Sequence, residues 1–331
     1  MDPPKSFPIL RLPFLAIEEI FKAMHPIEIL IFSIISKRAK AVTKQMTFYS
    51  KYSIELCIDE KMGIEIRRTN NLILRLYLIA SGKEVEENTV EGVGNSYNLR
   101  RIFKYSTDPV EEWKLLCIYV LEIFKKQTIG VLRMTMDAFV DQNVSIIDFL
   151  NTNVKSVDKC YLLQSEEEND VDEHTSYLLK NIKVNNELSS FLHIKNKNFD
   201  ETMPKNLKQL FIQNAEWIGY DRLLEIDSRH VFLMNDRITN EEWNMFLKKW
   251  MTMETHLNLE LLEFELKSFK DFRELVLDDI PHEVVDEGVK RTLITYRDKK
   301  MERSGGFDIK RIDGKTATCF VQYTGFEMIV H

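Results

Sequence analysis

Apolar side chains recur at helical spacing through the first fifty residues. Pro13 suits the opening of a helix, and the apolar positions that follow it favour one broad apolar face. His25-Pro26 ends this helix and begins the next, because the residue before a proline avoids helical backbone angles whereas proline fits a first helical turn. A third, short helix follows Ser36. The pattern therefore predicts three consecutive helices at the N-terminus.

The apolar period changes to two between residues 52 and 78. Such alternation marks half-buried strands, and Gly63 and Asn70-Asn71 interrupt it as turn residues. We expect a β-meander here. The segment from Ser81 to Asn98 is polar and contains glycine, so it is predicted to be a loop or linker.

Helix and strand signals follow one another from Asp108 to residue 150. Asp108 is a candidate N-cap and Pro109 fits the first helical position, so a helix is expected to follow. The apolar runs after it predict a strand at 129–136 and a further helix at 144–150.

Beyond residue 150, short apolar strands recur, each followed by a polar or helical stretch. Their spacing of roughly 20 to 30 residues is typical of the strand-plus-helix unit of leucine-rich solenoids. Leu207 to Asn214 comes nearest to that repeat consensus, and the other recurrences match it loosely. The expected strands are Cys160–Leu163, Phe191–Ile194, Leu207–Ile212, His230–Leu233 and Leu259–Leu266.

The C-terminal third combines two helical patterns with a β tail. The first helix is expected at 240–251, with Thr239 and Glu242 placed as a capping box, and the second at 275–296. Three strands are expected at 307–309, 316–321 and 326–330, with Asp313-Gly314 as a hairpin turn. The whole chain is therefore predicted to be mixed α/β. The expected segments are three N-terminal helices at 6–50, a connecting α/β region at 51–150 and an irregular leucine-rich-repeat-like α/β region at 151–331.

Composition and charge narrow the possible partners. The 331 residues are 44% hydrophobic and 29% charged, which is ordinary for a folded chain. The net charge is -7, and no segment gathers enough Lys and Arg to follow a phosphate backbone, so we expect no nucleic-acid partner. The acidic run from Glu166 to Glu173 is interpreted as a hydrated loop. The cysteines are isolated among apolar residues, so buried free thiols are expected, with neither a zinc site nor a disulfide framework.

Apolar runs are too short or too interrupted for membrane insertion. Arg11, Pro13 and Glu18-Glu19 break the stretch from residue 7 to residue 20, which argues against a signal peptide. The run from residue 27 to residue 35 is far shorter than the roughly 20 residues that span a bilayer. We therefore expect no membrane partner and a cytoplasmic or nuclear location, or both.

Motifs of catalysis are incomplete. His282 begins a pattern like that of a metalloprotease helix, but Asp286 stands where the second His is required. Gly92-Val93-Gly94 lacks the third glycine of a dinucleotide-binding turn. No nucleophile and base stand together in the sequence. We expect a non-enzyme without cofactor or metal.

Motifs near the N-terminus carry a family resemblance. Leu12-Pro13, an apolar pair at Ile20-Phe21, Pro26 followed by Leu30, and Ser36-Lys37-Arg38 have the order and approximate spacing of an F-box. The segment therefore resembles that family.

Departures from the general F-box pattern point to a particular group. Phe14-Leu15 replaces an acidic residue, His25 stands where Asp is common, and Ala39 replaces a frequent Trp. The opening from Phe7 to Ala16 is similar to that of the large nematode group of F-box proteins.

The same nematode group carries a C-terminal F-box-associated region, whose two motifs this chain resembles. Asn244, Phe246 and Trp250 fit the first motif. The segment 305–311, with Asp313-Gly314 and Ala317-Thr318 after it, fits the second. Lys310 and Arg311 of the second motif suggest an anion site, but strand alternation places charged residues outward by default.

The resemblance implies the substrate-recognition subunit of a Skp-cullin-F-box ubiquitin ligase. The N-terminal helices would bind a Skp-family adaptor, which joins them to a cullin, and the C-terminal region would bind an unknown protein substrate. By the helix-in-groove mode of the family, the implied adaptor-binding residues are Leu12, Pro13, Ile17, Ile20, Phe21, Pro26, Leu30 and Ile34.

Two other classes of function remain open at this point. The chain could be a leucine-rich-repeat-like interaction scaffold outside any ubiquitin ligase, with the N-terminal helices as the cap of a solenoid. An enzyme would require a cleft of converging titratable groups that the sequence does not display.

Overall fold

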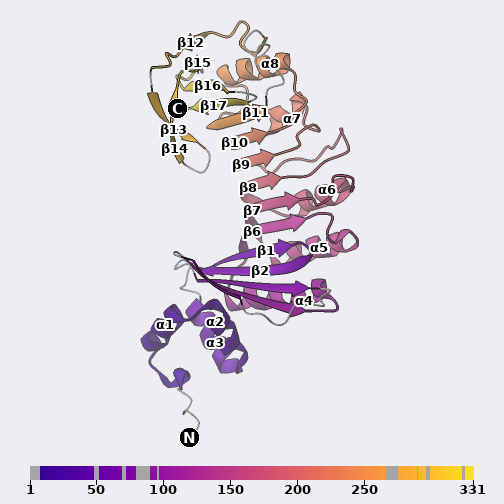
Figure 1. Cartoon of the computed structure of the whole chain (residues 1–331), viewed down its shortest axis with the longest axis vertical. Coiled ribbons are helices and arrows are strands. Elements are labelled where there is room, and N and C mark those ends of the chain that lie inside the picture. Colours follow the sequence, from indigo (N-terminus) through magenta and orange to yellow (C-terminus); the bar gives the residue numbers. More distant parts are fainter. Residues whose placement is uncertain are drawn as a thin grey trace. The chain divides into compact units, whose positions relative to one another are not determined.

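The computed structural model describes residues 8–47, 52–68, 72–79, 90–94, 97–265, 275–288, 290–295, 299–322 and 325–331 (Figure 1). The chain forms two compact units. The first comprises residues 1–134 and 145–157, and the second comprises residues 135–144 and 158–331. Both contain helices and strands, which confirms the predicted mixed α/β fold. The module boundaries expected at residues 50 and 150 stay predictions.

Three α-helices open the first unit, as the sequence predicts. His25 caps the second of them in a capping box with Glu28, whose carboxylate accepts a hydrogen bond from the His25 N–H at 2.7 Å. The His25 backbone is extended, as the following Pro26 requires. The Ser36 side chain accepts a hydrogen bond from the Ala39 N–H and begins the third helix. A short 3-10 turn, η1 (Ile9–Arg11), precedes α1 (Phe14–Ala23), α2 (Pro26–Ile34) and α3 (Lys37–Met46).

A β-sheet follows these helices, in the order β6-β1-β2-β3-β5-β4 within the first unit. Strands β1, β2 and β3 pair antiparallel, which confirms the meander. Gly63, however, lies inside β2; the turn is made at Asp59, whose side chain accepts a hydrogen bond from the Lys61 N–H. The strands are β1 (Tyr52–Ile58), β2 (Lys61–Arg68), β3 (Leu72–Ile79), β4 (Val90–Gly94), β5 (Tyr97–Tyr105) and β6 (Thr128–Thr135).

The prediction of a loop at 81–98 is wrong for the second half of that segment, which contains strands. Residues 90–94 and 97 onward form β4 and β5, which pair with each other, and β5 also pairs with β3. Cross-strand pairing at the sheet edge orders a segment whose own composition favours a turn. The first part of the expected loop, residues 81–89, lies outside the described residues.

Helices α4 (Pro109–Ile123) and α5 (Asn143–Asn153) confirm the helices expected there. The Asp108 side chain caps α4 by accepting a hydrogen bond from the Glu111 N–H. Trp113 anchors α4 on the sheet, because its indole N–H donates to the Gly63 carbonyl in β2 at 3.1 Å.

Polar contacts join the three N-terminal helices to the rest of the first unit. The Arg68 guanidinium in β2 donates to the Lys22 carbonyl at the end of α1, at 2.6 Å. The Thr47 hydroxyl after α3 donates to the Ile123 carbonyl of α4, also at 2.6 Å. These bonds use helix-end carbonyls that have no partner within their own helices, so α1, α3, α4 and the sheet are held together as one body.

Parallel strands with intervening helices form most of the second unit. Strands β8 to β11 pair in parallel, and Figure 1 shows α6, α7 and α8 along one side of this ladder. Strand β11 then pairs antiparallel with β17, and the sheet continues through β16, β15 and β12. In chain order the elements are β7 (Ser156–Leu163), α6 (Asp172–Asn181), β8 (Val184–Ser190), β9 (Leu207–Ile212), α7 (Tyr220–Glu225), β10 (Ser228–Leu233), α8 (Asn240–Met251) and β11 (Leu261–Glu265).

Most of the expected strands of this unit are confirmed, and one is misplaced. A strand was expected at 191–194, but the structure places it earlier in the chain, as β8 at Val184–Ser190. Its polar residues hid it from the apolar pattern: Glu187, for example, is buried on the sheet because Lys159 and Tyr161 bind its carboxylate at 2.8 and 2.9 Å. Part of the acidic run also differs from the hydrated loop, because Asp172 and Glu173 open α6.

The helix expected at 275–296 is wrong. Pro281 and Gly288 interrupt that segment. Residue 282 pairs with Ile309 and residue 290 with Ser304, so strand pairing replaces the helix. The C-terminal hairpin and strands are confirmed, with Gly314 at φ +93 in the turn. The last strands are β12 (His282–Val284), β13 (Lys290–Thr295), β14 (Lys299–Ser304), β15 (Phe307–Lys310), β16 (Thr316–Gln322) and β17 (Gly325–Val330).

Helix α8 supplies the core of the second unit. Trp243, Phe246 and Trp250 are each at most 2% exposed, and Trp243 stacks on Phe264 with ring centroids 3.7 Å apart. Asn244, on the same helix, donates from its side-chain amide to the Val276 and Asp278 carbonyls at 3.0 and 2.7 Å. The Asn, Phe and Trp of this motif are thus residues of the core.

We predict that Asn244→Ala lowers the free energy of unfolding by about 1–3 kcal/mol, because it removes the partner of buried carbonyls. Urea denaturation of the full chain measures this. Met245→Ala, at the neighbouring and 44% exposed position, is the control and should have little effect. Equal stabilities of the two variants would contradict the prediction.

His256 gives the second unit a dependence on pH. It is 8% exposed, its ring meets Phe246 edge to face at 4.9 Å, and burial lowers its pKa from 6.5 to about 4. Between pH 4 and pH 6.5, His256 therefore binds a proton in the unfolded chain but not in the folded chain. The free energy of unfolding is highest above pH 6.5 and falls as the pH decreases toward about 4.

We predict that His256→Asn reduces the loss of stability between pH 7 and pH 5, a loss that reaches about 3 kcal/mol near pH 4 for the full pKa difference. Asn tolerates the left-handed φ of +48 at this position. His282→Asn, at an exposed position, serves as the control. An unchanged pH profile in His256→Asn would refute the assignment.

Candidate partner-binding surface

Burial divides the eight residues that the resemblance implies as adaptor contacts. Half of them lie inside the packed helices, and the others reach the surface to different degrees. Buried are Ile17, Phe21, Pro26 and Leu30; half-buried are Leu12 and Ile20; exposed are Pro13 and Ile34.

The buried members of this set hold the helices together. Ile17 and Phe21 are 6% and 2% exposed, and the Phe21 ring packs edge to face on Phe32 of α2 with centroids 5.6 Å apart. A stripe of apolar residues on one helical face is what intramolecular packing requires. These side chains position α1 against α2.

Other apolar residues of α1 and α2 are exposed, and the sequence analysis did not select them as contacts. Leu15 is 72% exposed and Ile35 is 69% exposed, close to the 68% of the predicted contact Ile34. Phe14 and Ile31 are 42% and 53% exposed. The composition of α2 could have identified its exposed residues. Nearly every position of this helix is apolar, so packing on one side leaves apolar residues on the other.

An apolar groove of about 420 Å³ lies between α2 and α4, over β3 and β5. The walls come from the two helices, and a charged pair formed by Lys104 and Glu112 lies at its edge. Hydrogen bonds from Lys104 and Ser106 lower the pKa of Glu112, which stays ionised. The apolar lining residues are Ile27, Leu30, Ile31 and Ile34 of α2, Leu116 and Tyr119 of α4, Leu76 of β3 and Ile102 of β5.

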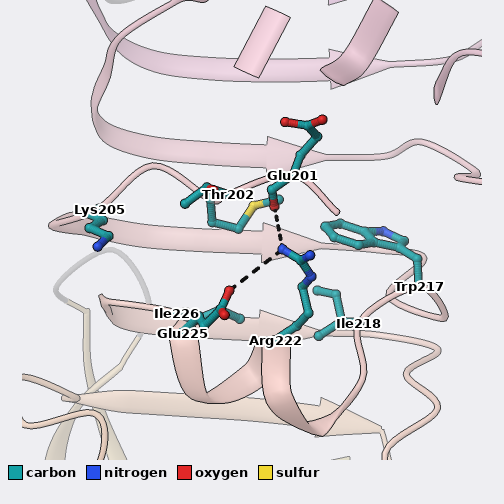
Figure 2. Close-up of a pocket in the computed structure, with 9 residues that line it drawn as sticks. Glu201, Thr202, Lys205, Trp217, Ile218, Arg222, Glu225 and Ile226 are labelled. Carbon is teal, nitrogen blue, oxygen red and sulfur yellow. Dashed lines mark hydrogen bonds and ion pairs between the residues drawn. The ribbon is translucent and has the colours of Figure 1, made fainter. Parts of the chain in front are cut away.

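A second hollow, of about 340 Å³, lies in the second unit between the segment before β9 and helix α7 (Figure 2). Arg222 of α7 donates to the Glu201 carbonyl at 3.0 Å and lies 3.8 Å from the Glu225 carboxylate. It also forms an ion pair with Asp200. Trp217 forms part of the lining. The guanidinium thus ties the segment at 200–201 to α7.

A wider and more open hollow of about 740 Å³ adjoins the second one and shares Trp217, Arg222 and Glu225 with it. Lys197 and Arg237 add positive charges to its lining, and Asp200, Asp221 and Glu242 add negative ones. Mixed charges with an aromatic wall suit polar recognition of another protein chain. The sequence analysis did not identify this site, because its lining comes from segments that only the fold brings together, and it interpreted Thr239 and Glu242 only as a helix cap.

Thiol chemistry finds no support in the structure. Cys117, Cys160 and Cys319 are buried, as expected, and Cys57 is half-buried. Burial raises the pKa of Cys57 and of Cys160 to about 12, so both thiols stay protonated and poorly nucleophilic. Within the described ranges no three His, Cys, Asp or Glu side chains are grouped as metal ligands.

Arg311, which the alternation rule placed outward, is buried. It is 4% exposed, lies 5.2 Å above the Trp250 ring, and binds the Asp313 carboxylate at 2.8 Å. The expectation is wrong because β15 ends at Lys310, and the chain turns before alternation reaches the next residue. Lys310 itself is exposed and pairs with Glu283 at 2.8 Å. Both charges thus have partners within the fold.

Comparisons with known proteins agree with these two regions. Residues 9–51 match the F-box domain family, and residues 198–264 match a family described as F-box associated. The chain is 22% identical, over an alignment of 348 positions with gaps included, to the Skn-1 dependent zygotic transcript 15 protein of Caenorhabditis elegans, and the alignment covers 95% of this chain and 93% of that protein. No solved structure matches the chain.

The matches confirm the family resemblance. Among the helices that the structure describes, none is long and apolar enough to cross a membrane. F-box and F-box associated families are typically non-catalytic modules that bind adaptors and substrates. An F-box implies a Skp1-type partner and a protein substrate. Residues 9–51 are thus similar to an F-box domain and residues 198–264 to an F-box associated region, a combination that suggests an F-box protein with an adaptor role in a ubiquitin ligase.

Proposed function

We propose that this chain is the substrate-recognition subunit of a Skp-cullin-F-box ubiquitin ligase. Helices α1 and α2 bind the Skp-family adaptor, the adaptor joins them to a cullin, and the second unit binds a protein target. The observation that carries the proposal is the exposure of several apolar residues within the segment similar to an F-box, among them Leu15 on α1 and Ile34 and Ile35 at the end of α2.

Exposed aliphatic side chains make the adaptor contact favourable. Fully burying one such side chain contributes roughly 1.5–3 kcal/mol, so a few of them supply a large part of the energy of a stable interface. Leu12, Pro13, Ile20 and Ile34 of the implied set are accessible enough to touch the adaptor, together with Leu15 and Ile35. The four buried members act indirectly, by holding the helices in place. A standard interface buries on the order of 1,600 Å².

The second unit offers the surface for a target. Its parallel ladder of strands β8 to β11 with helices between them supports a leucine-rich-repeat-like arrangement, which presents broad surfaces to other proteins. The two adjoining hollows around Trp217 and Arg222 lie within the F-box associated region and combine apolar, cationic and anionic groups. We assign target recognition to this unit.

We predict that the double variant Leu15→Asp, Ile35→Asp binds a purified Skp1-type adaptor at least about a hundredfold more weakly than the natural chain, because a charge would be buried at two contact positions. Titration calorimetry with the full chain measures the affinity. Both positions are exposed, so the fold should be unaffected. The control is Gln45→Asp, at an exposed position of α3.

Leu12→Ala with Pro13→Ala tests the contacts implied by the resemblance and should abolish co-purification with the adaptor. Undiminished binding by both double variants would refute the proposal. A chain that stays monomeric beside the adaptor on a sizing column would instead support the alternative, an interaction scaffold of leucine-rich-repeat type. That alternative is favoured by the strand-and-helix ladder alone.

Target recognition is tested by proximity labelling in cells. The natural chain and the Leu15→Asp, Ile35→Asp variant should label the same target proteins, and the targets should accumulate only with the variant, because it binds them without joining a ligase. The variant should lose labelling of the adaptor and cullin and keep labelling of the targets. Loss of the targets as well would contradict the separation of the two surfaces. Ubiquitin transfer by the purified chain alone would revive an enzymatic function.

A further inference from the structure

The groove between α2 and α4 is lined by residues at helical spacing. Ile27, Leu30, Ile31 and Ile34 stand at positions i, i+3, i+4 and i+7 of α2, which places them on one face. Opposite them, Leu116 is exposed enough on α4 to meet a ligand. The groove is therefore lined both by residues of the F-box match at 9–51 and by α4 residues outside it, such as Leu116.

Contacts within the first unit hold the two walls of the groove at a fixed separation. The Ser33 hydroxyl on α2 and the Tyr119 hydroxyl on α4 share a hydrogen bond of 2.6 Å. The Lys40 ammonium lies 5.0 Å from the centre of the Tyr119 ring. Trp113 fixes α4 to the sheet through the Gly63 carbonyl. The groove is therefore formed before any partner arrives, which lowers the entropy cost of binding.

Size and chemistry indicate an apolar protein segment as the occupant. A volume of about 420 Å³ falls within the roughly 300–1,000 Å³ typical of concave binding sites. Ile31 and Ile34 are 53% and 68% exposed although they line the groove. The charged pair of Lys104 and Glu112 is already neutralised internally, so the groove offers aliphatic contacts and little unpaired charge.

We propose that the Skp-type adaptor places an apolar segment in this groove, so that its interface extends from the F-box helices onto α4. This inference rests on the proposed function. The adaptor is the occupant because Ile34 belongs both to the groove and to the implied F-box contacts. A protein that covers the Ile34 side chain reaches Leu116 on the opposite wall, and an amphipathic helix presents its anchors at the spacing these walls require.

The test compares two neighbouring leucines of α4 in the full chain. Leu116→Arg places a charge in the groove, whereas Leu115→Arg places the same charge at a 70% exposed position outside the groove lining. Each new arginine stands four residues after a glutamate, Glu112 or Glu111, so the local helix electrostatics are matched. Leu116→Arg should weaken binding of a purified Skp1-type adaptor at least about tenfold, and Leu115→Arg should leave it within about twofold.

Failure of this inference is distinguishable from failure of the proposed function. If Leu15→Asp with Ile35→Asp abolishes adaptor binding while Leu116→Arg leaves it unchanged, the groove assignment is overturned and the proposed function stands. If none of these variants affects binding, both are overturned.

A measurement on the natural chain avoids any effect of substitution on folding. Amide hydrogen exchange in residues 109–123 should slow when the adaptor binds, because α4 becomes covered. Unchanged exchange in that helix would overturn the inference. So would self-association of the free chain that Leu116→Arg abolishes, since the groove would then hold a second copy.

Discussion

Helix α2 has more apolar surface than the fold can cover. Ile29 and Leu30 are almost fully buried, while Ile31, Ile34 and the following Ile35 remain more than half exposed. Exposed apolar residues grouped on one side of a helix are unfavourable in water and often mark a contact surface. The inner side of α2 packs within the first unit, and its outer side is the surface of the proposed adaptor contact. The placement of the F-box helices and the proposed adaptor interface both follow from this one constraint.

Three buried polar residues of the second unit each have partners within the fold. Asn244 binds two carbonyls, Glu187 binds a lysine and a tyrosine, and Arg311 binds a carboxylate beneath the Trp250 ring. Each of these groups would be costly to bury alone. The roles of Asn244 and Arg311 are therefore explained by folding, and the proposed target surface is formed by other residues, around Arg222.

Sequence patterns predicted the elements that depend on neighbouring residues and missed those that depend on residues distant in sequence. The N-terminal helices were predictable because Pro13, Pro26 and Ser36 act through local backbone geometry. Strand β8 and the segment around residue 282 were misread, because their state depends on pairing with strands distant in sequence. Among the adaptor contacts that the family resemblance implied, Ile17 and Phe21 lie on an apolar face that is buried within the fold. A helical stripe identifies a buried face and cannot say whether the covering protein is the same chain.

Local patterns in the sequence were enough to predict the mixed α/β class, the three opening helices, the capping of α4 and α8, and the resemblance to F-box proteins. Each of these depends on neighbouring residues or on a motif read in order. The folded structure was needed to show which apolar residues of α1 and α2 face solvent, that α4 forms a wall of the groove beside Ile34, and that Arg311 is buried. These features depend on contacts between segments far apart in the chain, and burial is a property of the assembled fold.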